Sequence, residues 1–335
     1  MTVNIGINGF GRIGRNTFRA LMENENLRVA AINDLTDNAT LAHLLKYDSL
    51  FGKFPGDVSV KGDNLNVNGR DIRILAEAQP ENLPWSELGV DIVIESTGRF
   101  RTHKDASRHL QGGAKKVIVS TPVNDADKII VMGLNHNQYE PDKHHILSNA
   151  SCTTNALAPV VKVLHENFEL KKGLMNTTHS YTNDQNLLDL PHPDLRRARA
   201  AQVSMIPTTT GAAKILGKII PELEGKVDGY AVRVPTPTVS LVDFVAELGK
   251  EVTAETANEA FKSAAANELR GILGYSEEPL VSVDYKGSPY SSVVDSLLTM
   301  ALGGNMLRVV AWYDNEWGYS QRVADLSFYI AQQGI

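Results

Sequence analysis

The chain has 335 residues, of which 42% are hydrophobic and 21% charged, and its formal net charge is −6. This composition is ordinary for a globular protein, and an acidic balance without a long basic run argues against nucleic acid as a main partner. No apolar run is long enough for a membrane span, no signal peptide precedes the first strand-like residues, and a single cysteine cannot form an internal disulfide, so we expect a cytoplasmic protein.

The first 34 residues have the pattern of a dinucleotide-binding unit. A buried strand over 3–8 runs into the GxGxxG sequence of residues 9–14, a helix follows over 12–23, and a second strand over 28–33 ends at Asp34. A lone GxGxxG motif is weak. The order strand, glycine-rich turn, helix, strand and acidic residue is specific, because each part has a physical role in holding a dinucleotide.

Those roles can be assigned residue by residue. Gly9 permits the tight turn, Gly11 lets the backbone approach a pyrophosphate, and Gly14 lets the helix pack closely on the strand. The Asp34 carboxylate would accept hydrogen bonds from the adenosine ribose. It would also repel a 2′-phosphate by on the order of 4 kcal/mol at about 4 Å and an effective dielectric near 20, which favours NAD over NADP.

Strands and helices continue to alternate up to residue 150. We expect helices over 38–47 and 106–110, a small antiparallel excursion within 57–75, and strands over 91–95, 116–120 and 128–132. This alternation predicts an α/β fold with a doubly wound parallel sheet. Ligands bind such sheets at the carboxyl ends of the strands, where Thr97 and Thr121 stand, although ordinary turn capping explains each of them equally well.

The only cysteine stands at the start of a predicted helix. A strand ends near residue 147, Ser151 is a good N-cap residue, and apolar residues at helical spacing extend the helix to about Phe168. Cys152 would then meet unpaired backbone N–H groups and the positive end of the helix dipole, which favour a thiolate. A small buried core residue explains the local sequence equally well.

The second half of the chain has a different pattern. We expect a strand over 174–180 that carries His179, an irregular polar stretch over 181–205, a helix from Ala212, alternating strands over 228–234 and 238–248, a helix over 253–267, a strand over 307–313 and a final helix to about residue 333. Such a pattern predicts a sheet with one face covered, and so long an irregular stretch is usually functional or interfacial. The nine histidines have no company at metal-ligand spacing, so we predict no metal site.

Eight segments, taken together, match one protein family: residues 7–14, 33–35, 148–159, 179–184, 194–199, 207–213, 233–237 and 312–316. The chain resembles the phosphorylating, NAD-dependent glyceraldehyde-3-phosphate dehydrogenases of bacterial type over essentially its whole length. The resemblance implies a Rossmann-type NAD-binding domain over 1–150 and 316–335. It also implies an α+β catalytic domain over 151–315 with a mostly antiparallel or mixed sheet, and a homotetramer in which residues 181–205 lie between subunits.

The resemblance also implies the site residues. The catalytic pair is Cys152, the nucleophile, and His179, its base. The implied cofactor-binding residues are Gly9, Gly11, Arg12, Ile13, Gly14, Asp34, Thr97, Thr121 and Asn315, with Asn315 on the nicotinamide amide. Thr182 and Arg233 are implied to hold the substrate phosphate, and the residues implied to hold the attacking phosphate are Ser151, Thr153, Thr210 and Gly211, with Arg197 near both.

The implied reaction oxidises D-glyceraldehyde 3-phosphate with NAD and inorganic phosphate to 1,3-bisphosphoglycerate, through a Cys152 hemithioacetal and thioester, as in glycolysis and gluconeogenesis. An erythrose-4-phosphate dehydrogenase and a catalytically silent NAD-binding protein are the alternatives. Two positions depart from the family pattern. Ala156 replaces a usual second cysteine, which removes a possible disulfide with Cys152, and residues 78–80 read Ala-Gln-Pro where many members have an Arg-Asp pair before the proline.

Overall fold

The computed structural model describes residues 2–335, which divide into two units. The first holds the chain up to Ile130 together with His136–Ala150 and Ser320–Ile335, and the second holds Val131–Asn135 and Ser151–Tyr319. The predicted domains differ from these units in two short segments, residues 131–135 and 316–319, which lie with the second unit.

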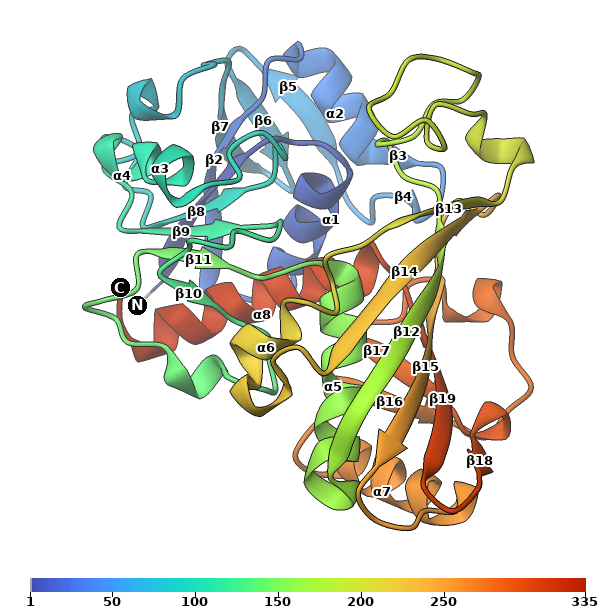
Figure 1. The fold of residues 1–335 in the computed structure, drawn as a ribbon. Helices are drawn as coiled ribbons and strands as arrows, with labels where there is room; N and C mark the ends of the chain where they lie inside the picture. Colours follow the sequence, from blue (N-terminus) through green and yellow to red (C-terminus); the bar gives the residue numbers. More distant parts are fainter. Residues whose placement is uncertain (1) are drawn as a thin grey trace. The chain divides into compact units, whose positions relative to one another are not determined.

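The first unit is built on a nine-stranded sheet with the order β10-β11-β9-β8-β1-β2-β7-β6-β5 (Figure 1). Its strands are β1 (Val3–Asn8), β2 (Leu27–Asn33), β5 (Val58–Lys61), β6 (Asn64–Val67), β7 (Arg70–Leu75), β8 (Ile92–Glu95), β9 (Lys116–Val119), β10 (Lys128–Ile129) and β11 (Ile146–Ser148). The seven strands from β10 to β7 pair in parallel, which confirms the doubly wound sheet. The excursion within 57–75 is antiparallel, as predicted, but its last strand pairs in parallel with β2 and belongs to the main sheet.

The helices of this unit follow the predicted order; one predicted helix is divided, and one predicted strand is shorter than expected. They are α1 (Arg12–Leu21), α2 (Asn38–Lys46), α3 (His103–Ala106), α4 (Arg108–Gln111) and the greater part of α8 (Trp317–Gln333); the short strands β3 (Tyr47–Asp48) and β4 (Gly52–Lys53) follow α2. The single helix expected over 106–110 is instead two short ones. They divide at Ser107, whose hydroxyl donates to the Lys104 carbonyl at 2.9 Å. The strand expected over 128–132 ends at Ile129, because the chain then turns and the Val131 N–H donates to Asn135 Oδ1.

The second unit contains an eight-stranded sheet with the order β13-β14-β12-β15-β19-β17-β16, and β18 pairs with β19. Its strands are β12 (Leu170–Ser180), β13 (Ile206–Thr209), β14 (Val227–Val234), β15 (Ser240–Leu248), β16 (Leu273–Ser276), β17 (Ser292–Asp295), β18 (Met300–Leu302) and β19 (Met306–Tyr313). The pairs β12–β14 and β16–β17 are parallel and the others antiparallel, which confirms a mixed, mostly antiparallel sheet.

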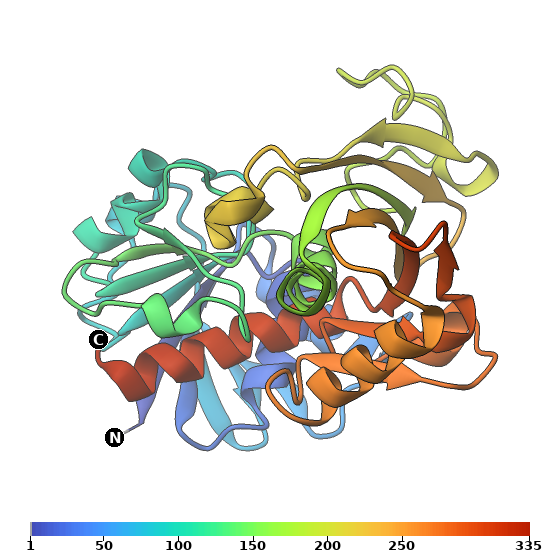
Figure 2. The same ribbon diagram turned by 60° about the horizontal axis from the view of Figure 1, so that its bottom comes forward.

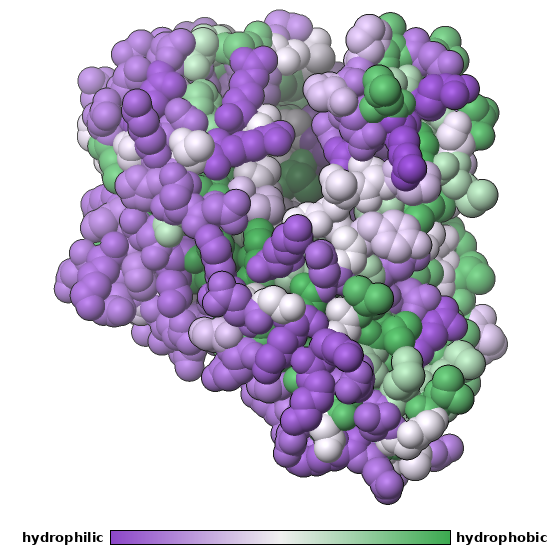
Figure 3. All heavy atoms as spheres, viewed as in Figure 1, coloured by the Kyte–Doolittle hydropathy of each residue, from purple (hydrophilic) through white to green (hydrophobic). Residues whose placement is uncertain are grey.

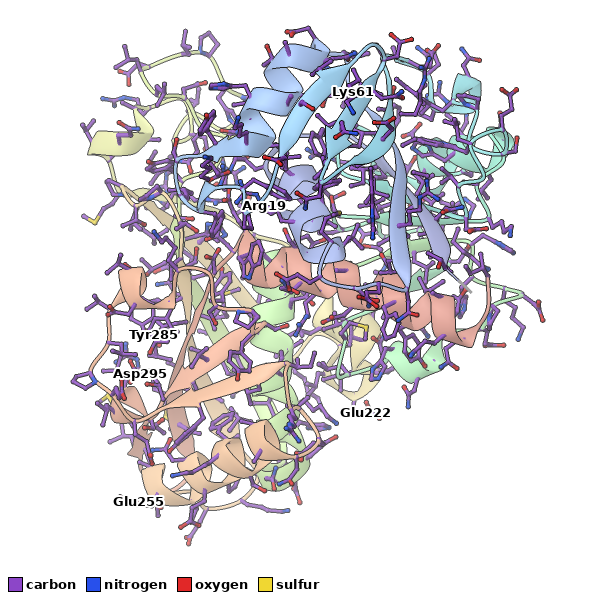
Figure 4. All side chains as sticks on the ribbon, turned by 180° about the vertical axis from the view of Figure 1, so that it is seen from behind. Arg19, Lys61, Glu222, Glu255, Tyr285 and Asp295 are labelled. Carbon is purple, nitrogen blue, oxygen red and sulfur yellow. The ribbon has the colours of Figure 1, made fainter. Side chains whose placement is uncertain are left out.

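One face of this sheet is covered by α5 (Cys152–Phe168), and α7 (Ala254–Ala266) packs beside α5. Figure 2 shows α5 nearly end-on, next to the curved strands. Leu157 and Val161 of α5 and Phe244 of β15 are fully buried, so the core of the unit lies between this helix and the sheet. Helix α7 begins at Thr253, whose hydroxyl accepts from the Thr256 N–H, and Glu255 stands in its first turn (Figure 4).

The helix predicted from Ala212 is wrong at its start. Residues 206–209 form β13, a turn covers 212–215, and only Leu216–Ile219 are helical, as α6. The local reason is that the Ala212 N–H donates to Thr210 Oγ1 at 3.2 Å, a side-chain bond that competes with a regular helical turn.

No helix within residues 2–335 is long and apolar enough to cross a membrane. No group of three or more His, Cys, Asp or Glu side chains in the same range is placed to hold a metal ion.

Candidate active site

Cys152 is the first residue of α5, as predicted. The helix is capped by Ser151, whose Oγ accepts from the Thr154 N–H at 3.0 Å. The residue before the cap, Ala150, has φ +55°, in the left-handed region that non-glycine residues seldom adopt. This bend turns the chain from β11 into the helix, and the Cys152 side chain keeps partial solvent exposure.

The thiol and the predicted base lie side by side. Cys152 Sγ is 3.6 Å from Nε2 of His179, the penultimate residue of β12, and the imidazole is 4% exposed. The other ring nitrogen, Nδ1, is 2.7 Å from the Ser180 carbonyl oxygen and donates to it. This bond fixes the tautomer, so that Nε2 carries the lone pair and faces the thiol.

Arg233 supplies the nearest positive charge. Strands β12 and β14 pair in parallel with His179 opposite Arg233, and Arg233 Nη1 donates to the Ser180 carbonyl at 3.0 Å while lying 2.6 Å from His179 Nδ1. The Nε atom of Arg233 is buried and has no hydrogen-bond partner among residues 2–335. A partly buried cation with a spare donor is suited to an anionic group of a ligand.

The protonation of the pair differs from the expectation drawn from the helix start. Burial raises the pKa of the Cys152 thiol, and this effect exceeds the lowering by Arg233 and by hydrogen bonds from Thr153. Burial, followed by the charge of Arg233, lowers the pKa of His179 to about 3. Both shifts favour a neutral thiol beside a neutral imidazole, so that a thiolate has to be made by proton transfer to Nε2.

Arg197 is held in place by the irregular segment and by β13. Its Nε donates to Thr208 Oγ1 at 2.9 Å, its Nη1 pairs with Asp184, and its Nη2 donates to the Thr209 carbonyl. Ile206 of β13 lies opposite Arg233, so the sheet places Arg197 near the end of β14 that carries Arg233. Arg197 is also close enough to lower the pKa of Arg233 and His179.

The hydroxyl groups predicted to hold phosphates are not all alike. Thr154 joins two of the segments: its Oγ1 shares a hydrogen bond with Ser151 Oγ at 2.8 Å and donates to the Ala212 carbonyl, which lies beside Thr210 and Gly211. Thr182 Oγ1 accepts only weakly, from the Asp184 N–H at 3.4 Å. Thr153 is 5% exposed, and its Oγ1 shares a hydrogen bond with Tyr313 Oη at 2.9 Å. Thr153 is thus engaged in the core of the unit, whereas Ser151, Thr182 and Thr210 are partly exposed.

Asn315 is held by two serines that the sequence analysis did not single out. Its Oδ1 accepts from Ser180 Oγ at 2.9 Å and from Ser240 Oγ at 3.1 Å. Serine is common in strands, so no pattern in the sequence marks either residue. The pairing of β12 with β15, and of β15 with β19, brings Ser180, Ser240 and Asn315 together.

In the first unit four of the predicted cofactor residues line a cleft of about 340 Å³ at the carboxyl ends of the strands. Its lining includes Gly9, Gly11, Asp34 and Thr97. Gly9 has φ +91°, and a Cβ on Gly14 would lie 2.1 Å from the Gly9 carbonyl oxygen, whereas a Cβ on Gly11 would meet nothing within 4 Å. The turn thus needs glycine at two positions for its own packing and leaves open space at the third.

Asp34 and Glu95 organise the floor of this cleft. Asp34 accepts from the Phe10 N–H at 2.8 Å and from the Thr36 N–H at 3.0 Å. Glu95 is 1% exposed, and its two oxygens accept from the Thr97 backbone and hydroxyl, from Asn8 Nδ2 and from His109. The sequence analysis did not pick out Glu95 as a site residue, although a charged residue that ends an apolar strand is a signal for one.

Five predicted cofactor residues do not appear in the lining of the cleft: Gly14, whose packing against Gly9 is described above, Asn315, which belongs to the second unit, and Arg12, Ile13 and Thr121. The Arg12 side chain pairs with Asp48 at 2.5 Å, Ile13 lies in the first turn of α1, and Thr121 follows the neighbouring strand β9. Thr121 Oγ1 is buried with no hydrogen-bond partner in the part of the chain that the structure describes. An open glycine at a helix start, an acidic residue after β2 and a spare hydroxyl are features that fit a dinucleotide.

Comparison with known proteins identifies the family. Residues 3–103 match the model of the glyceraldehyde 3-phosphate dehydrogenase NAD-binding domain, and residues 151–315 match that of the C-terminal domain. The chain is 62% identical to glyceraldehyde-3-phosphate dehydrogenase of Geobacillus stearothermophilus over the full length of both chains. It is 60% identical to glyceraldehyde-3-phosphate dehydrogenase 1 of Bacillus cereus over 99% of each chain, and 55% identical to the Streptomyces coelicolor enzyme over 99% of this chain and all of the other.

The chain belongs to the glyceraldehyde-3-phosphate dehydrogenase family. Its cofactor is NAD, because the matching family model is that of an NAD-binding domain. The resemblance drawn from the sequence motifs is thereby confirmed, and so is the class of enzyme, an NAD-dependent oxidoreductase.

The two departures from the usual pattern of glyceraldehyde-3-phosphate dehydrogenases can be placed in the structure. Ala156 lies one turn after Cys152 on α5 and is fully buried. Ala78 lines the cofactor cleft, and Gln79 bonds to Arg108 outside it. The first departure therefore adjoins the thiol, and the second leaves a short side chain where a ligand would lie.

Proposed function

We propose that this chain catalyses the oxidative phosphorylation of D-glyceraldehyde 3-phosphate to 1,3-bisphosphoglycerate with reduction of NAD. The relatives that match over the full length are named for this aldehyde. The observation that carries the proposal is the 3.6 Å contact between Cys152 Sγ and His179 Nε2, with the cation of Arg233 beside His179 Nδ1. We assign NAD binding to residues 1–150 with 316–335, and catalysis to residues 151–315.

The first step makes and uses the thiolate. His179 Nε2 removes the thiol proton as Sγ attacks the aldehyde carbon, so a C–S bond forms and the carbonyl oxygen becomes an oxyanion. The Cys152 N–H at the start of α5 and the protonated His179 stabilise that oxyanion. The positive charge of Arg233 lowers the pKa of His179. The imidazolium therefore gives up its proton readily, to the substrate oxygen or to water.

Oxidation and phosphorylation complete the cycle. NAD would supply the acceptor for the hydride that leaves the carbon attached to Cys152, and Asn315 would hold its nicotinamide amide. Removal of this hydride turns the hemithioacetal into a thioester, and His179 takes up the hydroxyl proton. Inorganic phosphate, held by Ser151, Thr210, Gly211 and Arg197, then attacks the thioester carbon. The C–S bond breaks, and the acyl phosphate leaves while Thr182 and Arg233 hold the substrate phosphate.

The direct test is a spectrophotometric assay of NADH formation. Purified protein is given glyceraldehyde 3-phosphate or erythrose 4-phosphate, each with and without inorganic phosphate, and with NAD or NADP. We expect turnover of the triose that requires phosphate and prefers NAD. Phosphate-independent oxidation of erythrose 4-phosphate would establish the alternative enzyme, and absence of turnover with tight NAD binding would establish the silent protein.

Cys152→Ser tests the role of the thiol. We expect kcat to fall by on the order of 10⁴-fold or more, because loss of a covalent nucleophile has effects of this size, while NAD binding persists. Ala156→Ser places the same hydroxyl one helical turn away and is the matched control, with activity close to that of the unchanged protein. Wild-type turnover by Cys152→Ser would overturn the scheme.

We also propose that the chain forms a homotetramer. Two exposed apolar surfaces support this. The first is on the irregular segment, and its exposed residues are Leu187, Leu188, Leu190, Leu195, Val203 and Met205. The second is on the sheet face opposite α5, and its exposed residues are Leu174, Tyr230, Val245, Leu302 and Met306. Figure 3 shows apolar residues gathered over both regions of the second unit, while the first unit presents mainly hydrophilic residues. Surfaces of this kind mark interaction sites, and sedimentation analysis would give the mass of the assembly.

A cytoplasmic location is the remaining proposal about this function. The chain has one cysteine, which matches a reducing compartment, and its substrates are phosphorylated metabolites of central metabolism. Cell fractionation with assay of each fraction tests it, and activity found mainly outside the cytoplasm would contradict it.

A further inference from the structure

Ser180 connects three groups of the proposed site. Its carbonyl oxygen accepts from His179 Nδ1 at 2.7 Å and from Arg233 Nη1 at 3.0 Å, and its hydroxyl donates to Asn315 Oδ1 at 2.9 Å. The side chain is 0% exposed. Ser180 therefore contacts His179, Arg233 and Asn315.

Ser240 completes the arrangement from the neighbouring strand. Its Oγ accepts from the Ser180 N–H at 3.1 Å and donates to Asn315 Oδ1 at 3.1 Å. Because the Ser240 oxygen already accepts a backbone proton, its own proton is free to be donated, and an amide oxygen is the partner that can take it. Two hydroxyl donors on one amide oxygen fix the Asn315 side chain with Oδ1 on the serines and the NH₂ group pointing away from them.

The segment that carries Ser240 is held under strain. Val239 is 2% exposed and has φ +67°, a conformation that is an outlier for a β-branched residue. Its side chain packs with Tyr285, which stacks on Trp312 at 5.4 Å between ring centroids and is labelled in Figure 4. The neighbour on the other side, Thr238, donates to Asp314 Oδ1 at 3.1 Å. Thr238 and Ser240, the two neighbours of Val239, thus hold Asp314 and Asn315 in place. The packing of Val239 in the core maintains the strained backbone between them.

We propose that Ser180 and Ser240 are positioning residues that fix the Asn315 amide so that its NH₂ donates to the carbonyl oxygen of the nicotinamide carboxamide. The inference deepens the proposed function and rests on the assignment of Asn315 to the nicotinamide. It adds that Asn315 is the donor and the carboxamide oxygen the acceptor in that contact. A donor toward the carbonyl selects a ring that bears an acceptor oxygen, and it does not require the amide nitrogen of the ligand.

Binding measured without turnover tests the proposal. Dissociation constants for NAD and for ADP-ribose, which lacks the nicotinamide, are measured by calorimetry on the purified chain and on Ser180→Ala, Ser240→Ala and the double variant. We expect the double variant to bind NAD about tenfold more weakly, as loss of two buried hydrogen bonds implies, with ADP-ribose binding unchanged. Ser292→Ala, which removes another fully buried serine of the same unit, is the matched control and should change neither constant.

The sense of the contact is tested with an analogue. 3-Acetylpyridine adenine dinucleotide keeps the ring carbonyl and loses the NH₂, so the unchanged protein should bind it about as well as NAD. Much weaker binding of this analogue by the unchanged protein would mean that Asn315 presents its oxygen, and the proposal would fall. Equal weakening of NAD and ADP-ribose binding in the serine variants would mean a merely structural role and would also overturn it.

Asn315→Ala separates the two levels of inference. If Asn315→Ala weakens NAD but not ADP-ribose binding while the serine variants bind both normally, the positioning role fails and the nicotinamide contact stands. If Asn315→Ala itself changes neither constant, the assignment of Asn315 fails, and the positioning role fails with it. Ser180→Thr, which keeps a hydroxyl, should restore part of the NAD affinity that Ser180→Ala loses.

Discussion

The cofactor cleft of the first unit and the thiol site of the second are built by different means. The cleft is formed by backbone: a positive φ at Gly9, a close packing that only glycine allows at Gly14, and N–H groups that Asp34 and Glu95 hold in place. The thiol site is formed by buried side chains, and both Cys152 and His179 have pKa values shifted by burial and by Arg233.

This difference indicates what each region can tolerate. A cleft made of backbone binds by shape, so a side-chain change nearby alters the dissociation constant of the cofactor and leaves the reacting groups unchanged. A site made of buried charge depends on which groups are ionised, so a change of one side chain alters the protonation of its neighbours. Variants of Cys152, His179 and the residues assigned to phosphate should therefore act mainly on the chemical steps, and variants of the first unit mainly on cofactor affinity.

Arg197→Ala should give the largest effect within this comparison. Its guanidinium is bonded to Thr208, Asp184 and the Thr209 carbonyl, and we assign it to phosphate, so its loss removes charge-assisted bonds worth about 1.5–3 kcal/mol each. We expect kcat/KM for inorganic phosphate to fall by roughly 10²-fold or more, with NAD affinity unchanged.

Arg199→Ala is the matched control for this variant. Arg199 belongs to the same segment, but its side chain is 68% exposed and pairs with exposed Asp189. Its removal should leave steady-state kinetics with phosphate as they were. Equal losses in the two variants would mean that the segment as a whole, and not the Arg197 charge, supports the reaction.

The sequence predicted the first unit better than the details of the second. Strands 3–8 and 28–33 and the turn between them are local, and each is set by short-range rules of glycine geometry and hydrophobic pattern. The Ser151 cap of α5 is equally local and was predicted correctly. The helix expected from Ala212 failed because the Thr210 side chain and the pairing of β13 with β14, which no pattern at Ala212 reveals, decide that turn.

The contacts of the thiol site were out of reach for a related reason. Cys152 and His179 are 27 residues apart, and Ser180 and Asn315 are 135 apart. Only the packing of α5 on the sheet and the pairing of the strands bring these groups together. The family resemblance named Cys152, His179 and Asn315 but gave no indication of Ser180, Ser240 or Glu95. Spacing along the chain also cannot tell how deeply a thiol is buried, so it could not indicate that burial raises the pKa of Cys152.

Glu95→Gln tests whether the first unit works through backbone positions. The Glu95 carboxylate accepts four hydrogen bonds, two at each oxygen. In the glutamine variant an NH₂ group takes the place of one oxygen and would face two hydrogen-bond donors. We expect the dissociation constant for NAD to rise roughly 10- to 100-fold, with kcat at saturating NAD nearly unchanged, because the variant displaces Thr97 and the end of β8.

Asp91→Asn supplies the control for that variant. Asp91 stands at the opposite end of the same strand, where it accepts from the Asn4 N–H and pairs with Lys115. This change should lower the free energy of unfolding slightly without altering NAD affinity. A similar loss of NAD affinity in both variants would show that the strand, and not its carboxyl end, is what matters.

The smallest expected effect is that of His179→Gln on the free energy of unfolding at acid pH. Burial and Arg233 lower the pKa of His179 to about 3, whereas in the unfolded chain it stays near its usual value of about 6.5. The unfolded state therefore binds a proton that the folded state refuses, and stability falls as the pH drops below about 6.5 and continues to fall toward about 3. By pH 5.5 this one group should lower the free energy of unfolding by about 1 kcal/mol relative to pH 7. Glutamine does not titrate, so urea unfolding at the two pH values should show a smaller decrease for the variant by about that amount. An identical decrease in the two proteins would mean that His179 takes up its proton as easily in the folded site as in water, and the contrast between a charged, buried site and a backbone-built cleft would lose its main support.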